Sequence, residues 1–337
     1  MKKINRPIII FSSILLICLI FLPRVIGGKQ QSENTIRENG GVKKYKVGLI
    51  TKSTSSSFFQ TVYSGASTAS TAYNMDLVFK GPENEEDYET QNRMIREMVE
   101  DGVDAIIFSA IDYNANAEAI DEAAGKNVKI VVIDSDVNST MVSCRIGTDN
   151  YKAGCMVGEG ALRSEDEKLN IGIVNFDENS ENGQGRERGF RDTVAKDLRA
   201  TIVKKIKVLS SIESAKTGTQ EMLKENPEIN VIVTFNEWTS LGVGYAIDDM
   251  KLGPDTTVIA FDNNVVSVGM LETGEVDGLI VQNPYAMGYI GMETVYKLLN
   301  GFSLPKDLID TDTILVDRNN MYDEECQRLL FAFDQKK

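Results

Sequence analysis

Four polar residues stand directly after short apolar runs, and this pattern constrains the fold more than any other feature of the chain. Asp134 follows KIVVI, Asn236 follows VIVTF, Asp262 follows TVIAF and Gln282 follows GLIV. Each run is typical of a buried strand, and open parallel sheets bind ligands outside the carboxyl ends of their strands. Hydrogen-bonding side chains gathered there suit a small polyhydroxylated ligand rather than a nucleic acid or a lipid.

Short apolar runs alternate with segments of helical period from Tyr45 onward. The first series predicts strands at 46–51, 75–80, 104–110 and 129–134, separated by helices at 58–73, 85–101 and 114–125. The second predicts strands at 171–176, 201–208, 230–235, 257–262 and 278–282, each followed by a helix (183–196, 214–225, 240–250, 265–273 and 285–300). Regular alternation predicts α/β architecture with parallel sheets covered on both faces. Because the series restarts and the chain has 337 residues, we expect two similar lobes.

Composition excludes several classes of function. The net charge of −14 argues against nucleic-acid binding, which needs clustered Lys and Arg. The chain has no histidine, so imidazole metal sites and histidine-activated nucleophiles are excluded. No phosphate-binding glycine loop, nucleophile elbow or metal-ligand cluster appears, so we expect no catalytic residue, no metal and no cofactor. Cys144, Cys155 and Cys326 form no CxxC pair, and the sequence leaves open whether they are buried thiols or include a disulfide.

The N-terminal segment 1–28 carries Lys2, Lys3 and Arg6 before an apolar stretch, which is typical of a chain directed to or across the cytoplasmic membrane. Three fates compete: lipid attachment at Cys18, cleavage near Gly27, or retention as a signal anchor. Ile17 argues against lipid attachment, which requires a small residue before the cysteine. We favour the anchor, with the remainder on the extracellular side of the cell membrane. Residues 29–43 are polar and aperiodic, so we expect a tether.

The motifs from residue 45 to 328 occur in an order that resembles the type I periplasmic sugar-binding proteins, the ribose- and galactose-binding group. The segments that carry the resemblance are GLITKSTSSSFFQTVYSGA, EDYETQNRMIREMVEDGVDAIIFSA, VVIDSDVNS, RIGTDNYKAG, IGIVNFDENSENGQGRERGFRD, IVTFNEWTSLGVGYAI, VIAFDNN and GLIVQNPYAMGYIG. The group shares its fold with the effector domains of lactose-repressor-type regulators.

The resemblance implies two α/β/α lobes joined by a three-stranded hinge. The crossings would fall near 148–149, 282–283 and 312–313. One lobe would comprise 44–148 plus 283–312, and the other 149–282 plus 313–334. The ligand would be engulfed between the lobes as they close.

The resemblance also assigns roles to particular residues. Phe58 and Phe59 would stack on a sugar ring, with Trp238 closing its other side, although each could instead pack into a core. Asp134 and Asp262 would accept hydrogen bonds from hydroxyls, although an aspartate there could also cap a helix.

The other implied contacts are polar. Arg186 would donate a forked pair of bonds, leaving Arg188 structural, while Asn236 and Gln282 could each donate and accept. Lys52, Ser56 and Ser109 would line the mouth of the site. Ser135 stands where ribose binders have arginine, and an aromatic residue expected near Ser210 is absent.

The resemblance therefore implies a monosaccharide ligand, for which we take a pentose as the working choice. The membrane partner would be a sugar ABC permease or a sensor histidine kinase, and a retained anchor slightly favours the kinase. The alternatives are a carbohydrate-responsive transcriptional regulator, a binder of a non-sugar ligand such as a furanosyl autoinducer, and a glycosidase that uses paired acids. The N-terminal segment carries no basic helix-turn-helix, which disfavours the regulator.

Overall fold

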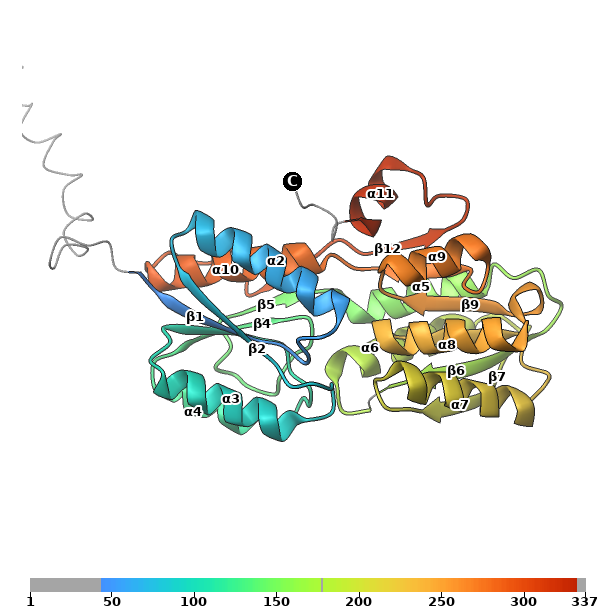
Figure 1. Ribbon diagram of the computed structural model, residues 1–337, viewed down its shortest axis with the longest axis horizontal. Helices are drawn as coiled ribbons and strands as arrows, with labels where there is room; N and C mark the ends of the chain where they lie inside the picture. Colours follow the sequence, from blue (N-terminus) through green and yellow to red (C-terminus); the bar gives the residue numbers. More distant parts are fainter. Residues whose placement is uncertain (1–43, 177, 332–337) are drawn as a thin grey trace, which may run out of the picture. The chain divides into compact units, whose positions relative to one another are not determined.

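The computed structural model describes residues 44–176 and 178–331. Within these residues the chain forms two six-stranded sheets, each covered by helices on both faces (Figure 1). The predicted membrane segment 1–28 and tether 29–43, with Cys18, lie outside the described residues. None of the described helices has the length and apolar character that a membrane crossing requires.

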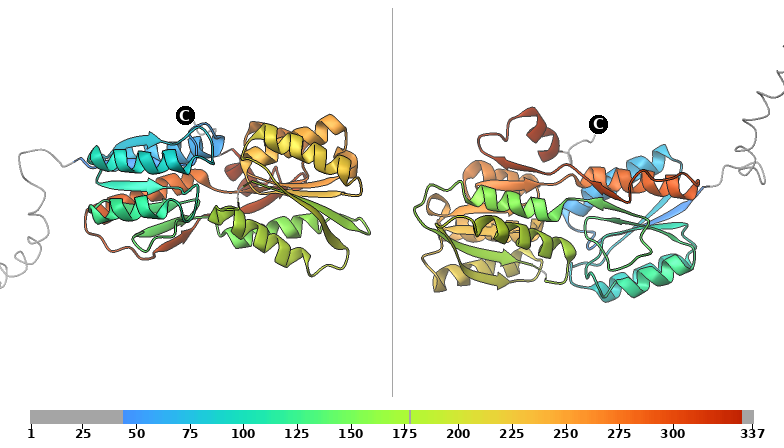
Figure 2. Two further views of the ribbon diagram at one scale, coloured as in Figure 1. Left: turned by 90° about the horizontal axis from the view of Figure 1, so that it is seen from below. Right: turned by 180° about the vertical axis from the view of Figure 1, so that it is seen from behind.

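The first sheet has the strand order β11-β5-β4-β3-β1-β2, and all its pairings are parallel. Its strands are β1 (Lys46–Ile50), β2 (Asp76–Lys80), β3 (Ala105–Phe108), β4 (Lys129–Ile133), β5 (Cys144–Gly147) and β11 (Leu308–Asp310). Helices α2 (Ser57–Ala72) and α10 (Pro284–Leu299) pack together on one face, and α3 (Tyr88–Glu100) and α4 (Ala117–Gly125) cover the other (Figure 2). Separate apolar clusters fill the two faces, which explains why the strands are apolar throughout.

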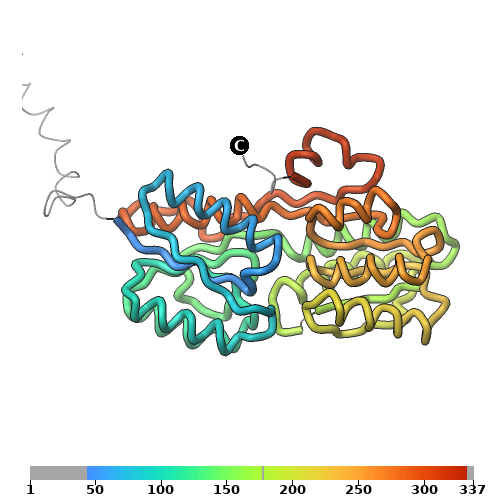
Figure 3. The backbone as a smooth tube through the Cα atoms, in the orientation of Figure 1, coloured from blue at the N-terminus to red at the C-terminus, as the bar shows by residue number. Residues whose placement is uncertain are grey.

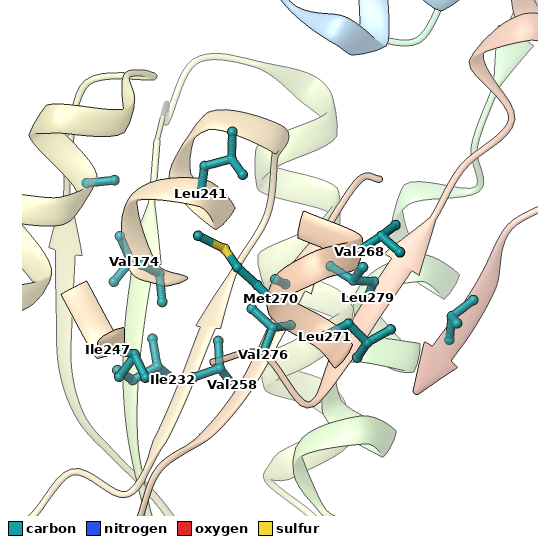
Figure 4. Close-up of a cluster of buried hydrophobic side chains, with 14 of the residues drawn as sticks. Val174, Ile232, Leu241, Ile247, Val258, Val268, Met270, Leu271, Val276 and Leu279 are labelled. Carbon is teal, nitrogen blue, oxygen red and sulfur yellow. The ribbon is translucent and has the colours of Figure 1, made fainter. Parts of the chain in front are cut away.

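The second sheet has the order β12-β10-β9-β8-β6-β7, and only the edge strand β12 runs antiparallel to its neighbour. Its strands are β6 (Leu169–Asn175), β7 (Ala200–Lys207), β8 (Val231–Thr234), β9 (Thr257–Phe261), β10 (Gly278–Val281) and β12 (Ile314–Asp317). Helices α5 (Asn150–Ala161) and α6 (Glu181–Val194) lie on one face. Helices α7 (Ile212–Glu225), α8 (Glu237–Met250) and α9 (Val265–Thr273) lie on the other, over the cluster shown in Figure 4. A short helix α11 (Glu324–Leu330) adds Leu329 and Leu330 to that cluster.

Three connections link the two sheets, and the chain can be followed through them in Figure 3. They lie between β5 and α5, between β10 and α10, and between β11 and β12. The predicted fold class, two similar parallel-sheet lobes joined by three connections, is therefore confirmed.

The sequence prediction missed β5, α5, β11, β12 and α11. Helix α5 contains three glycines, which disfavour a helix on local propensity. Its packing explains them, because a Cβ on Gly154 would lie 1.9 Å from the backbone oxygen of Arg186 in α6. Cys144, Cys155 and Cys326 are free thiols, and Cys144 and Cys326 are buried.

Candidate functional site

A small cavity lies between the carboxyl ends of the two sheets. It has a volume of about 20 Å³, room for roughly one water molecule, because polar side chains from both sides meet across it. Nine of the eleven predicted site residues line it: Lys52, Ser56, Phe58, Phe59, Asp134, Arg186, Asn236, Asp262 and Gln282. We call this the central cavity. The residues predicted from sequence thus meet in space although they lie up to 230 positions apart in the chain.

The two predicted aspartates occupy equivalent places in the two lobes. Asp134 follows β4 and Asp262 follows β9, with φ angles of 58° and 66°. The backbone N–H of Asp134 donates to the carbonyl of Ile146 in β5 at 3.0 Å. That of Asp262 donates to the carbonyl of Ile280 in β10 at 2.9 Å. Left-handed backbone is uncommon outside glycine, although aspartate tolerates it, and strained positions of this kind cluster at ligand-binding sites.

Arg186 is 2% exposed and is held by three different elements. Its Nε donates to Asn150 at 2.9 Å, Nη1 to the carbonyl of Phe235 at 2.7 Å, and Nη2 to Gln282 at 2.9 Å. The guanidinium also lies 4.4 Å from the centre of the Phe261 ring. Burial lowers the pKa of Arg186, and the nearby Asp262 opposes that effect. Because three of its five N–H groups are used, two remain for a ligand.

The two predicted amide side chains, Asn236 and Gln282, differ in how many hydrogen-bond donors remain for a ligand. Asn236 caps helix α8 by accepting from the Thr239 N–H, and its Nδ2 donates to Ser210 at 2.7 Å and to Glu85 at 3.2 Å. Both N–H donors of Asn236 are therefore used within the protein. The residue follows a strand and serves as the N-cap of the next helix.

Gln282 keeps one donor. Its Oε1 accepts from Arg186 and from Thr148, and its Nε2 donates to Asp262 at 2.6 Å. The amide orientation is fixed by these partners, so the remaining Nε2 hydrogen can be donated to a ligand.

The aromatic pair stands at the start of helix α2. The rings of Phe58 and Phe59 meet edge to face with centres 5.1 Å apart, and both are largely buried. Ser56 caps the helix, and its hydroxyl donates to Glu237 at 2.7 Å across the cavity. Lys52 is 3% exposed, donates to Asn182 at 3.2 Å and lies 5.8 Å from the Phe176 ring centre.

Two predicted residues do not line the cavity. Ser109 is buried behind it and donates to Asp134 at 2.7 Å, so it orients that carboxylate. Trp238 lies in the first turn of α8 and is partly exposed. The contact of all eleven residues with a ligand stays a prediction.

Four lining residues were missed: Glu85, Phe176, Asn182 and Glu237. Glu85 was placed in a helix, but α3 begins only at Tyr88, capped by Asp87, which leaves Glu85 in the loop after β2. Glu85 lies five positions beyond the end of β2, so a rule that takes the residue directly after an apolar run does not select it. Glu237 stands between the two neighbours that the prediction chose, Asn236 and Trp238.

The cavity contains more carboxylates than cations. Glu85, Asp134, Glu237 and Asp262 face Lys52 and Arg186, and each carboxylate accepts a hydrogen bond from an uncharged donor. Burial raises the pKa of Asp262 to about 7 and that of Glu85 to about 7, with Arg186 and Lys52 opposing the respective shifts. The Glu85 residue as a whole is partly exposed, but its carboxylate accepts hydrogen bonds from the buried Ser210 and Asn236. Such a set of acceptors and amide donors can pair with several hydroxyl groups at once.

Paired lobes with a polar cavity between their strand ends define a binding protein that holds a small solute. The chain belongs to the periplasmic binding protein domain family, whose model matches residues 47–302, and this confirms the predicted family. It is 25% identical to a D-ribose/D-allose-binding protein of Pseudomonas aeruginosa, over 89% of this chain and 93% of that protein.

Two solved structures are similar over most of the chain. A carbohydrate transporter solute-binding protein from Agrobacterium radiobacter, in complex with D-arabinose, is 27% identical with a TM-score of 0.83, covering 86% of this chain and 100% of that one. An ABC transporter solute-binding protein from Agrobacterium vitis, with bound D-fucose, is 26% identical with a TM-score of 0.82, covering 85% and 99%.

Proposed function

We propose that this chain is an extracytoplasmic binding protein that closes around a monosaccharide and presents it, or the closed form itself, to a membrane partner. The observation that carries the proposal is the convergence of Asp134 and Asp262, at equivalent strand ends of the two sheets, on one cavity with Arg186. The relative named for D-ribose and D-allose, and the two structures solved with D-arabinose and D-fucose, support a sugar as the ligand. A pentose remains our working choice.

The proposed lobes are 44–148 plus 283–312 and 149–282 plus 313–334. The sheets support these boundaries, since β5 and β11 belong to the first and β6, β10 and β12 to the second. Ligand contact would come from both lobes, so binding would stabilise the closed arrangement by the difference in affinity between the two arrangements.

The donors and acceptors that remain match hydroxyl chemistry. Arg186 and Gln282 have N–H groups left to donate, and Asp262 accepts at Oδ1 only, as far as the described residues show. Phe58, Phe59 and Phe176 supply apolar surface for the face of a sugar ring. We propose binding without turnover, because the cavity carboxylates accept hydrogen bonds from serine hydroxyls and side-chain amides and none lies beside a candidate nucleophile pair among the described residues.

A thermal-shift screen tests this function. The full chain in mild detergent is heated with D-ribose, D-arabinose, D-allose, D-fucose and D-xylose. A sugar at 100 times its dissociation constant stabilises the folded state by about 2.7 kcal/mol and should raise the melting temperature by roughly 5 °C.

Matched carboxamide variants localise the effect. Asp262→Asn and Asp134→Asn should abolish most of the shift, whereas Glu221→Gln, an exposed acid on α7, should leave it unchanged. No shift with any sugar, or release of a product from one, would refute the proposal.

The membrane partner is either a sugar ABC permease or a sensor histidine kinase. The relatives that are named as transport proteins favour the permease, while the predicted anchor at 1–28 favours the kinase. Deleting the gene for the chain should abolish uptake of the bound sugar in the first case, and sugar-induced kinase phosphorylation with uptake unchanged in the second.

A further inference from the structure

A second cavity, which we call the lateral cavity, adjoins the central one. Its volume is about 540 Å³, well within the range of about 300–1,000 Å³ that small-ligand sites occupy. Asp134 lines both cavities, and Glu181 in the lateral cavity is the sequence neighbour of Asn182 in the central one. Asp134 is therefore the residue that the two linings share, and its carboxylate accepts a hydrogen bond from Asn182 at 3.2 Å.

Both halves of the molecule build the lateral cavity. Tyr113, Arg145 and Asp310 come from the side of the first sheet, and Tyr151 and Arg188 come from α5 and α6 on the second. A group bound here would touch both halves, as a ligand of the central cavity would.

Two planar, solvent-accessible side chains, Tyr151 and Arg188, form part of the wall of the lateral cavity. Tyr151 is 42% exposed, and the guanidinium of Arg188 lies 5.8 Å from the Tyr151 ring centre. That ring contact is the only interaction of Arg188 found among the described residues, so its five N–H groups are available, contrary to the structural role expected for it. A tyrosine ring beside an uncommitted guanidinium offers both stacking surface and donors to a sugar-like group.

The charge of the wall restricts the ligand. Five carboxylates line it (Asp134, Asp136, Asp149, Glu181 and Asp310) against two guanidiniums, of which Arg145 is already paired with Asp136 at 2.8 Å. An anionic group would be repelled, so phosphorylated and uronic units do not suit this cavity.

We propose that the lateral cavity binds a second, uncharged glycosyl unit attached to the sugar in the central cavity, so that the chain takes a disaccharide or glycoside. This inference rests on the proposed sugar-binding function.

Calorimetric titration of the full chain tests it. The monosaccharide that gives the largest thermal shift is compared with its two methyl glycosides and with its disaccharides with glucose. At least one disaccharide should bind as tightly as the monosaccharide or more tightly, and the matching glucuronic acid conjugate should bind more weakly.

Variants of the wall separate the two cavities. Tyr151→Ala and Arg188→Ala should weaken disaccharide binding about 5- to 10-fold and leave the monosaccharide within about 2-fold. Tyr151→Phe should restore disaccharide affinity because it keeps the ring. Tyr322→Ala, at a tyrosine that is 69% exposed and lines neither cavity, is the control.

If a monosaccharide binds but all its disaccharides bind more weakly, the lateral site is refuted while the sugar-binding function stands. The same holds if the two alanine variants weaken both ligands equally or weaken neither. If neither type of ligand binds, the proposed function itself fails.

Discussion

At the scale of single residues, the site depends on carboxylates held in unfavourable surroundings. Asp262 is 5% exposed, lies in left-handed backbone and has its pKa raised to about 7 by burial. Its nearest compensation is the charge of Arg186 and one hydrogen bond from Gln282. The folded protein thus loses stability by keeping an acceptor where a ligand hydroxyl could meet it.

This cost predicts a dependence of stability on pH. The folded-state pKa of Asp262 exceeds the unfolded value of about 3.9, so between about pH 4 and pH 7 the folded state binds more protons. The free energy of unfolding therefore falls as pH rises through that window and levels off above it. Asp262→Asn keeps the backbone preference and the acceptor for Gln282, and relative to wild type it should gain on the order of 1–3 kcal/mol between pH 4.5 and pH 8.

Urea unfolding at pH 4.5, 6, 7 and 8 measures the effect. Glu85 shifts in the same direction, so Glu85→Gln combined with Asp262→Asn should flatten the profile further. Glu221→Gln serves as the exposed control. A wild-type protein whose stability rises between pH 5 and pH 7 would contradict the assignment.

At the scale of elements, two helices in each lobe pack backbone against backbone at a pair of glycines, one glycine on each helix. A Cβ on Gly65 of α2 would lie 2.0 Å from the Tyr285 oxygen of α10, and a Cβ on Gly189 of α6 would lie 2.0 Å from the Tyr151 oxygen of α5. Such close approach of two backbones leaves no room for a side chain. In the second lobe, the glycine crossing of α5 and α6 also sets the position of Arg186.

Gly154→Ala is therefore expected to affect both stability and binding. The added carbon would push α5 away from the Arg186 carbonyl, which lies 1.9 Å from it, at a cost of about 1–3 kcal/mol. Sugar affinity should fall as well, because Arg186 shifts with its helix. Gly269→Ala, in α9 with no atom within 4 Å of the added carbon, should be neutral or stabilising by up to about 1 kcal/mol. Thermal unfolding and titration of both variants check this, and equal behaviour of the two would refute the packing argument.

Strand ends could be predicted from sequence because an apolar run of strand length that stops at a polar residue is typical of a buried strand in an α/β chain. Asp134, Asp262 and Gln282 were found in this way. The choice between Glu237 and Trp238 could not be made, because successive helical residues point about 100° apart and the sequence does not fix where α8 begins. Helix α5 was missed because its glycines make sense only against α6.

At the scale of the whole molecule, one hydrogen-bond network joins all three connections between the sheets to the proposed site. The Thr148 hydroxyl donates to Gln282 at 2.8 Å and lies 3.3 Å from the Thr313 hydroxyl. Gln282 in turn bonds Arg186 and Asp262. A ligand held by Asp262 and Arg186 would thus act directly on the residues where the chain crosses between the lobes.

Thr148→Val removes this donor with little change in volume, and it should shift the balance of the lobes away from the arrangement described here. Loss of one neutral hydrogen bond is worth about 0.5–1.5 kcal/mol, which corresponds to roughly 2- to 10-fold in affinity. Because position 148 does not line the central cavity, every monosaccharide should weaken by the same factor, the signature of a smaller binding-competent population. Asp262→Asn, in contrast, should change the ranking of the sugars.

Titration with three sugars, together with small-angle scattering for the expected increase in radius of gyration, measures both effects. Thr219→Val, at a buried threonine in α7 remote from the connections, is the matched control. A Thr148→Val variant that weakens one sugar far more than another would show that Thr148 acts through ligand contact and not through closure.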